Sequence, residues 1–145
     1  MLKYFLLFLF FISGCAKPNY QDTSSPNTPI STYDYQLTST SKNLNIGLNF
    51  EKPPTTNGEV VFTIKFYHPQ TPEILIDADS AWDVILWMPS MGHGSSPVKI
   101  EKIATGYYRV SRVYFIMPGD WDLIIRFKNS ETLNVTEQII QKFSL

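Results

Sequence analysis

Two thioethers and one imidazole lie close together near the middle of the chain. In the stretch Trp87-Met88-Pro89-Ser90-Met91-Gly92-His93-Gly94, the donors Met88, Met91 and His93 have the spacing Met-x-x-Met-x-His. Pro89 has a fixed φ angle and the glycines permit unusual backbone conformations, so the stretch is predicted to turn sharply. Soft sulfur together with imidazole is a ligand set that suits Cu(I). The spacing therefore predicts a loop that wraps one Cu(I) ion.

A fourth donor is available in Met117, which precedes a Pro118-Gly119 turn. The alternative interpretation is that the methionines only fill gaps in the core, which is a common use of this residue. Met88 and Met117 each end an apolar segment, as that interpretation expects. His93 stands between two glycines, a position atypical of a buried core residue, and it is the residue that most favours a metal site.

Strands are predicted to position this loop. The unbroken apolar run at 84–87 precedes it and is typical of a strand buried on both faces. Apolar and polar residues alternate over 44–50 and again over 60–67, which predicts an antiparallel hairpin. The alternation over 107–116 changes phase near Ser111-Arg112, which predicts a bulge or a bend between sheets. In the alternating segment 121–127, Ile124 interrupts the polar side.

The turns recur about every 8–12 residues and no segment has helical periodicity, a pattern typical of all-β sandwiches. We therefore predict an antiparallel immunoglobulin-like or cupredoxin-like β-sandwich of about seven to eight strands over residues 43–145. Trp87 and Trp121 are predicted to lie in its core, since large aromatic side chains pin two sheets together.

The first residues have the features of a targeting segment. Lys3 precedes nine apolar or aromatic residues, Tyr4 to Ile12, fewer than the roughly 20 needed to span a bilayer. Ile12-Ser13-Gly14-Cys15 then resembles a bacterial lipobox, in which the cysteine receives lipid and becomes the new N-terminus. Residues 1–14 are therefore predicted to be a lipoprotein signal peptide and Cys15 the lipidated residue. The alternatives are an uncleaved N-terminal anchor and an ordinary signal peptide with a chance cysteine.

Cys15 is the only cysteine, so the domain is predicted to have no internal disulfide. Residues 15–42 are rich in Pro, Ser, Thr and Asn and are predicted to form a lipidated, flexible polar tether. Ala16, rather than an acidic residue, follows the cysteine. The expected location is therefore the cell envelope, on the periplasmic side of the outer membrane if the organism is Gram-negative.

Charge and motifs exclude several classes of function. Removal of residues 1–14 takes away Lys3 and changes the formal net charge from −1 to about −2, so nucleic-acid binding is not expected. The chain has no Gly-x-Ser-x-Gly, phosphate loop or His-Glu-x-x-His, so no enzyme activity is predicted. Asp77, Asp79 and Asp83 lack the spacing of a calcium-binding EF-hand and are expected to be solvated loop carboxylates.

Three ordered motifs carry a resemblance to a known family. They are Met-Pro-x-Met-x-His-Gly at 88–94, Gly-x-Tyr at 106–108 and Met-x-Gly-x-Trp at 117–121. Over residues 44–130 the chain resembles the YtkA-like/FixH-like domain family. The resemblance implies a small, non-enzymatic, extracytoplasmic sandwich, often held at a membrane, and some relatives are associated with assembly of copper-containing terminal oxidases. FixH-type proteins carry a membrane-spanning helix, and this chain has a lipobox instead.

These observations predict a lipid-anchored, non-enzymatic envelope protein that binds Cu(I) through its Met/His loop in copper handling or terminal-oxidase maturation. Its expected partners are the membrane, through lipid, and an envelope protein or copper-oxidase assembly factor. The alternative is a metal-free protein-interaction module. A copper site requires Met91 and His93 at the surface with sulfur and nitrogen converging, whereas a buried Met91 and an averted His93 favour the module.

Overall fold

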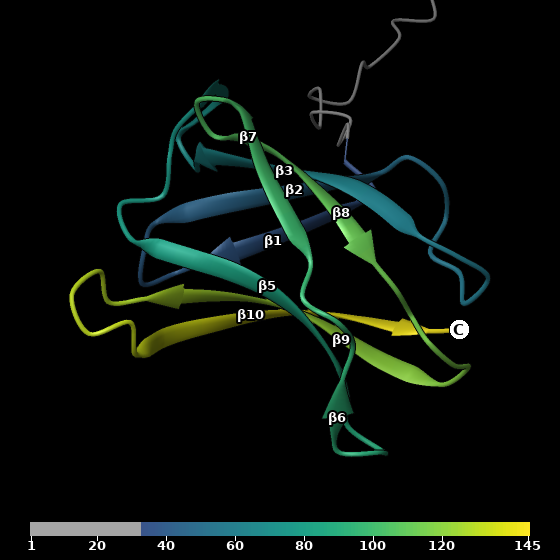
Figure 1. Cartoon of the computed structure of the whole chain (residues 1–145). Coiled ribbons are helices and arrows are strands. Elements are labelled where there is room, and N and C mark those ends of the chain that lie inside the picture. Colours follow the sequence, from purple (N-terminus) through teal and green to yellow (C-terminus); the bar gives the residue numbers. More distant parts are fainter. Residues whose placement is uncertain (1–32) are drawn as a thin grey trace, which may run out of the picture. The chain divides into compact units, whose positions relative to one another are not determined.

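The structure, a computed structural model, describes residues 33–145, which fold as two antiparallel β-sheets packed face to face (Figure 1). No helix occurs in this part of the chain, so it contains no helix that could cross a membrane. The strands are β1 (Tyr35–Ser39), β2 (Leu44–Phe50), β3 (Val60–His68), β4 (Thr71–Leu75), β5 (Ala81–Met88), β6 (His93–Gly94), β7 (Lys99–Ala104), β8 (Tyr107–Val113), β9 (Asp120–Lys128) and β10 (Val135–Ser144).

The first sheet has the order β1-β2-β3-β8-β7, with β4 also paired to β3, and the second has the order β10-β9-β5-β6. All pairs are antiparallel. The prediction of an all-β antiparallel sandwich is therefore confirmed. Residues 33–145 contain ten strands rather than seven or eight; β1 lies in the segment predicted as tether, and β6, with two residues, is too short to show a periodicity.

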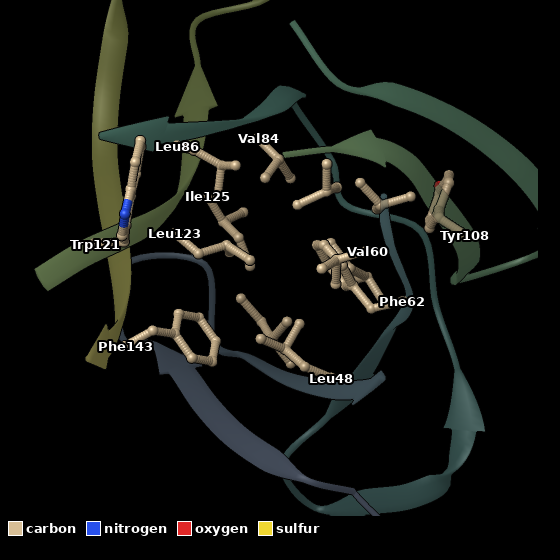
Figure 2. Packing of buried hydrophobic residues seen from close by; sticks show 14 of the residues in the cluster. Leu48, Val60, Phe62, Val84, Leu86, Tyr108, Trp121, Leu123, Ile125 and Phe143 are labelled. Carbon is tan, nitrogen blue, oxygen red and sulfur yellow. The ribbon is translucent and has the colours of Figure 1, made fainter. Parts of the chain in front are cut away.

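The core fills the space between the sheets, where side chains of β9 and β5 meet those of β2 and β3 (Figure 2). The predicted hairpin is confirmed as β2–β3, with Leu48 opposite Ile64 and Phe50 opposite Phe62. Trp121 is fully buried, as predicted. Its ring lies edge-on to Phe115 at a centroid distance of 5.8 Å.

The predicted change of phase in β8 is confirmed at Arg112. Its φ angle is +58°, and its backbone N–H donates to the Glu59 carboxylate at 2.6 Å. The pairing register between β3 and β8 shifts in the same region, between Val60 and Phe62. This irregularity lets Val110 and Val113, which are three residues apart, both face the interior.

Ordered structure begins earlier than the predicted boundary at residue 43. Strand β1 pairs with β2 along its whole length. The Tyr35 ring lies edge-on to Phe50 and Phe143, at 5.8 and 5.4 Å. The predicted tether is thus wrong for residues 35–39, because alternate side chains of that segment, starting with Tyr35, contribute to the core. The predicted signal peptide, Cys15 and the first part of the tether lie outside the described residues.

Candidate functional site

The Met/His stretch forms the turn of the β5–β6 hairpin at one edge of the second sheet, and it projects from the body of the sandwich (Figure 1). The backbone N–H groups of Met91 and Gly92 both donate to the Met88 carbonyl, at 3.1 and 3.0 Å. The sharp turn predicted after Pro89 is therefore confirmed. It reverses the chain so that β6 runs back beside β5.

This reversal places Met88 directly opposite His93 in the pairing register. Opposed residues of an antiparallel pair point to the same face, with Cβ atoms about 4.5–5.5 Å apart. That face is the inner one, because Met88 is only 4% exposed. The half-buried His93 ring lies 6.5 Å from the Trp121 ring, at an interplanar angle of 71°. A thioether and an imidazole are thereby brought together at the rim of the core.

The imidazole of His93 has one nitrogen engaged by the backbone. Nδ1 lies 3.3 Å from the carbonyl oxygen of Gly94. In the tautomer that carries its proton on Nδ1, that N–H donates to the carbonyl and the lone pair of Nε2 remains available. Metal-binding histidines are commonly oriented in this way, with the second nitrogen held by a carbonyl or carboxylate.

Met117 joins this group through the turn before β9. The Trp121 indole N–H donates to the Met117 carbonyl at 2.9 Å, and the Met117 side chain packs against the core. Gly119, with φ of +138°, lies against Met88, because a Cβ at Gly119 would clash with the Met88 methyl carbon. The Met117 backbone is thus held by Trp121, and Gly119 of the same turn lies against Met88.

Met91 lies apart from this group, at the tip of the turn, and is 57% exposed. Of the two predicted geometries, the structure has the exposed Met91 required for a copper site. His93, however, is turned toward the core rather than fully toward solvent.

Trp87 corrects two predictions. It is 36% exposed and so does not belong to the core, and Ile85 is only half-buried. The strand is therefore not buried on both faces. Because side chains alternate along a strand, the inward positions of Leu86 and Met88 place Trp87 on the outer face.

Among residues 33–145, no three His, Cys, Asp or Glu side chains gather closely enough to hold a metal ion. The described domain therefore has no cluster of the oxygen and nitrogen ligands that Ca²⁺ and Zn²⁺ prefer.

A second polar site lies near the other end of β5 and was not predicted. The Asp77 carboxylate accepts hydrogen bonds from the Tyr108 hydroxyl at 2.6 Å, the Gly106 N–H at 2.8 Å and the Lys102 ammonium at 2.6 Å. These bonds, led by that from Lys102, lower the pKa of Asp77 to about 2. Burial and the bond to Asp77 raise the pKa of Tyr108 to about 12. Asp77 is thus a structural carboxylate, and the Gly-x-Tyr motif supplies two of its donors.

Asp83, which lies in β5, and the loop residue Asp79 also have separate cationic partners. Asp83 accepts two hydrogen bonds from Arg126, directly opposite it on β9, and lies 2.6 Å from Lys128. Burial raises the pKa of Asp83, but the hydrogen bonds from Arg126 and Lys128 outweigh it and lower the pKa below its usual value. Asp79 pairs with Lys42 at 3.3 Å. The prediction of solvated loop carboxylates holds for Asp77 and Asp79, which are exposed, and is wrong for Asp83, which lies in β5 and is half-buried; the three do not converge on one site.

Comparison with known proteins identifies one family. A family model described as YtkA-like matches residues 38–126, from β1 into β9, and the match includes all three motifs. No match to the chain was found among curated proteins.

Proposed function

The chain belongs to the YtkA-like family, and on this premise we propose that it is a non-enzymatic protein of the cell envelope that binds Cu(I) at the β5–β6 hairpin. The observation that carries the proposal is the register pair Met88–His93, which sets a thioether opposite an imidazole. Cu(I) here is a cargo to be held and passed on, in copper handling or in the maturation of a terminal oxidase.

Four side chains are assigned as donors. His93 offers Nε2 while Nδ1 is held by the Gly94 carbonyl. Met88 and Met117 offer sulfur from the side of the core, and the exposed Met91 offers sulfur from the side of the solvent. These donors are neutral and polarizable, which suits a soft monovalent ion better than a hard divalent one. Met91 is the side chain through which Cu(I) enters and leaves.

Competition with a chromophoric Cu(I) chelator, under anaerobic reducing conditions, tests this assignment. We expect one Cu(I) per chain with about micromolar or tighter affinity, which corresponds to at least about 8 kcal/mol. His93→Gln and Met91→Leu remove a donor while nearly preserving volume, and each is expected to weaken binding about tenfold or more. His68→Gln is the matched control, because His68 bonds to Asn43 on another part of the surface. Copper binding would be refuted if the protein did not compete with the chelator, or if the variant carrying both His93→Gln and Met91→Leu kept the native affinity.

We also propose that Cys15 carries lipid and holds the domain at a membrane. The support is the sequence Ile12-Ser13-Gly14-Cys15 behind a short apolar segment. Metabolic labelling with a fatty-acid analogue is expected to mark the native chain and to leave Cys15→Ser unlabelled. Equal labelling of both chains, or recovery of the native chain in the soluble fraction, would contradict lipid anchoring.

A metal-free protein-interaction module is the second candidate. The observation in its favour is that the projecting hairpin exposes two large apolar side chains, Trp87 and Met91. In that case a photo-crosslinking residue at position 91 is expected to capture one envelope protein reproducibly, with or without copper. Capture that depends on copper would instead support a role in copper transfer.

A further inference from the structure

We propose that the chain forms a homodimer in which the free edge of β10 pairs antiparallel with β10 of a second copy, about a twofold axis at Ile140. The pairing would join the two β10-β9-β5-β6 sheets into one continuous sheet. It requires neither copper nor the Met/His hairpin, so it stands or falls separately from the proposed function.

β10 is a long edge strand, and near its beginning Glu137 accepts hydrogen bonds from the hydroxyl groups of Ser39 and Ser41. Of the strands in residues 33–145 it is the longest, with ten residues, and within this part of the chain its backbone pairs only with β9. The other edge strands are shorter: β1 has five residues, β6 has two, and β7 has six, of which Lys99, Glu101 and Lys102 are charged. Charged side chains and short length are the usual means by which an edge avoids pairing with another chain. β10 contains no proline, and its only charged residues are Glu137 and Lys142.

The hydrogen-bonding pattern of β10 determines which backbone groups are available. Leu145 and Gly119 exchange two hydrogen bonds, at 2.8 and 3.1 Å, and therefore form a hydrogen-bonded pair. Such pairs alternate along an antiparallel ladder, so Phe143, Gln141 and Ile139 direct their N–H and C=O groups toward β9. The same groups of four other residues point away from the sheet: Gln138, Ile140, Lys142 and Ser144.

A row of isoleucines crosses the outer face of the sheet and ends at this edge. Ile85 on β5 lies opposite Ile124 on β9, and Ile124 lies opposite Ile140 on β10. Ile124 is only 7% exposed although it belongs to the outer face, whereas Ile140 is 42% exposed. The row explains why Ile124 interrupts the polar side of its strand. It also leaves an apolar side chain at the outermost strand.

The sequence of β10 is complementary to itself in one antiparallel register. With the axis at Ile140, Ile140 faces its own copy, Gln138 faces Lys142, and Thr136 faces Ser144. No like charges oppose each other, and the isoleucine row continues through the axis into the second copy. Shifting the axis to Ile139 would place Gln138 opposite Ile140 and would break the row. These features favour a second copy of the chain over an unrelated strand.

Site-specific crosslinking of the full chain in detergent micelles tests this register. In Ile140→Cys the two new thiols would lie on Cα atoms about 5.5 Å apart, within reach of a short bifunctional thiol reagent. Gln138→Cys is the matched control, because its two copies would lie about 13 Å apart along the strands. We expect a covalent dimer from Ile140→Cys, none from Gln138→Cys or the native chain, and a dimer from Gln138→Cys mixed with Lys142→Cys. Equal dimer yields from Ile140→Cys and Gln138→Cys alone would refute the register.

Sedimentation velocity of the full chain in the same detergent tests the dimer itself. Ile140→Lys would place two ammonium groups opposite each other at the axis, and we expect it to weaken dimerisation at least tenfold. Ile103→Lys, at an exposed position of β7, is expected to leave it unchanged. A native chain that remains monomeric up to hundreds of micromolar, or equal weakening by the two variants, would overturn the proposal.

Discussion

The regions at the two ends of β5 differ in whether their functional groups find hydrogen-bonding partners within the domain. At the beginning of the strand, Trp82 packs edge-on against Tyr108 at 4.9 Å, and the Tyr108 hydroxyl is bonded to Asp77. There the carboxylate, the hydroxyl and the backbone N–H of Gly106 satisfy one another within the chain. At the end of the strand, Met88 and His93 are brought together, and Nε2 of His93 has no bonding partner within residues 33–145.

This difference assigns separate roles to the Gly-x-Tyr motif and the Met/His motif, which are equally prominent in the sequence. The Gly-x-Tyr motif is explained by stability, because its residues serve Asp77. The turn alone requires neither the imidazole nor the exposed thioether of the Met/His motif. Nε2 of His93 and the exposed Met91 sulfur, which the fold does not use, are therefore the first donor atoms to assign to a ligand. The following predictions test this distinction, from the largest expected effect to the smallest.

Trp121 packs at the end of β5 that carries the Met/His motif, and Trp121→Ala should lower the free energy of unfolding the most among these substitutions. It would open a cavity in the core and leave the Met117 carbonyl without its donor, at a cost of about 3–5 kcal/mol in the free energy of unfolding. Urea denaturation measures this value. Trp87→Ala is the control and should cost less than about 1 kcal/mol, because Trp87 faces outward. Similar losses for both would show that the division into inner and outer faces is wrong.

Gly106→Ala should lower the free energy of unfolding more than the loss of any single hydrogen bond to Asp77. Gly106 has φ of +62°, and an added Cβ would lie 2.6 Å from backbone atoms of Ile76 and 2.8 Å from the Phe66 carbonyl. We expect a loss of more than about 2 kcal/mol, since the backbone conformation alone costs about 1–3 kcal/mol. Thermal and urea unfolding both measure it. Wild-type stability in this variant would mean that the turn relaxes freely.

Tyr108→Phe should cost about 1–2 kcal/mol, because it removes one hydrogen bond to a charged carboxylate and leaves the ring in place. Urea denaturation again provides the measurement. Tyr107→Phe is the control and should change stability by less than about 0.5 kcal/mol. If affinity for Cu(I) fell in Tyr108→Phe, the two ends of β5 would not be independent.

As the pH falls, the contribution of Asp77 to the free energy of unfolding should decrease gradually. The folded-state pKa of Asp77 is about 2, below the ordinary value of 3.8, so the unfolded chain binds the proton first as the pH falls. The contribution of Asp77 is therefore complete above about pH 4 and is lost between the two pKa values. Asp77→Asn should flatten the decline of stability over this range, measured by urea unfolding at several pH values. An equally steep decline in the variant would assign the acid sensitivity to other groups, among them Asp83.

The sequence was sufficient for the fold because most strands have a clear alternation. The β2–β3 hairpin, the irregularity at Arg112 and the burial of Trp121 all follow from local pattern. Trp87 was predicted incorrectly, because a continuous apolar run does not show which side chains face inward. The run at 84–87 contains no polar residue that would mark the outward-facing positions.

Long-range pairing explains what the sequence could not reveal. Asp77 and Tyr108 are 31 residues apart, and only the pairing of β3 with β4 and β8 brings their segments together. The same holds for β10, whose isoleucine is ordinary in sequence and becomes part of a row only through register with β9 and β5. Met88 and His93, by contrast, could be paired from sequence alone, because a single turn joins them.

X-ray absorption at the copper edge tests the central claim most directly. In the protein loaded with one Cu(I), we expect nitrogen and sulfur scatterers together in the first coordination shell, with the nitrogen contribution reduced in His93→Gln. A shell without sulfur, or a spectrum unchanged by His93→Gln, would contradict the assignment of Cu(I) to the Met/His hairpin.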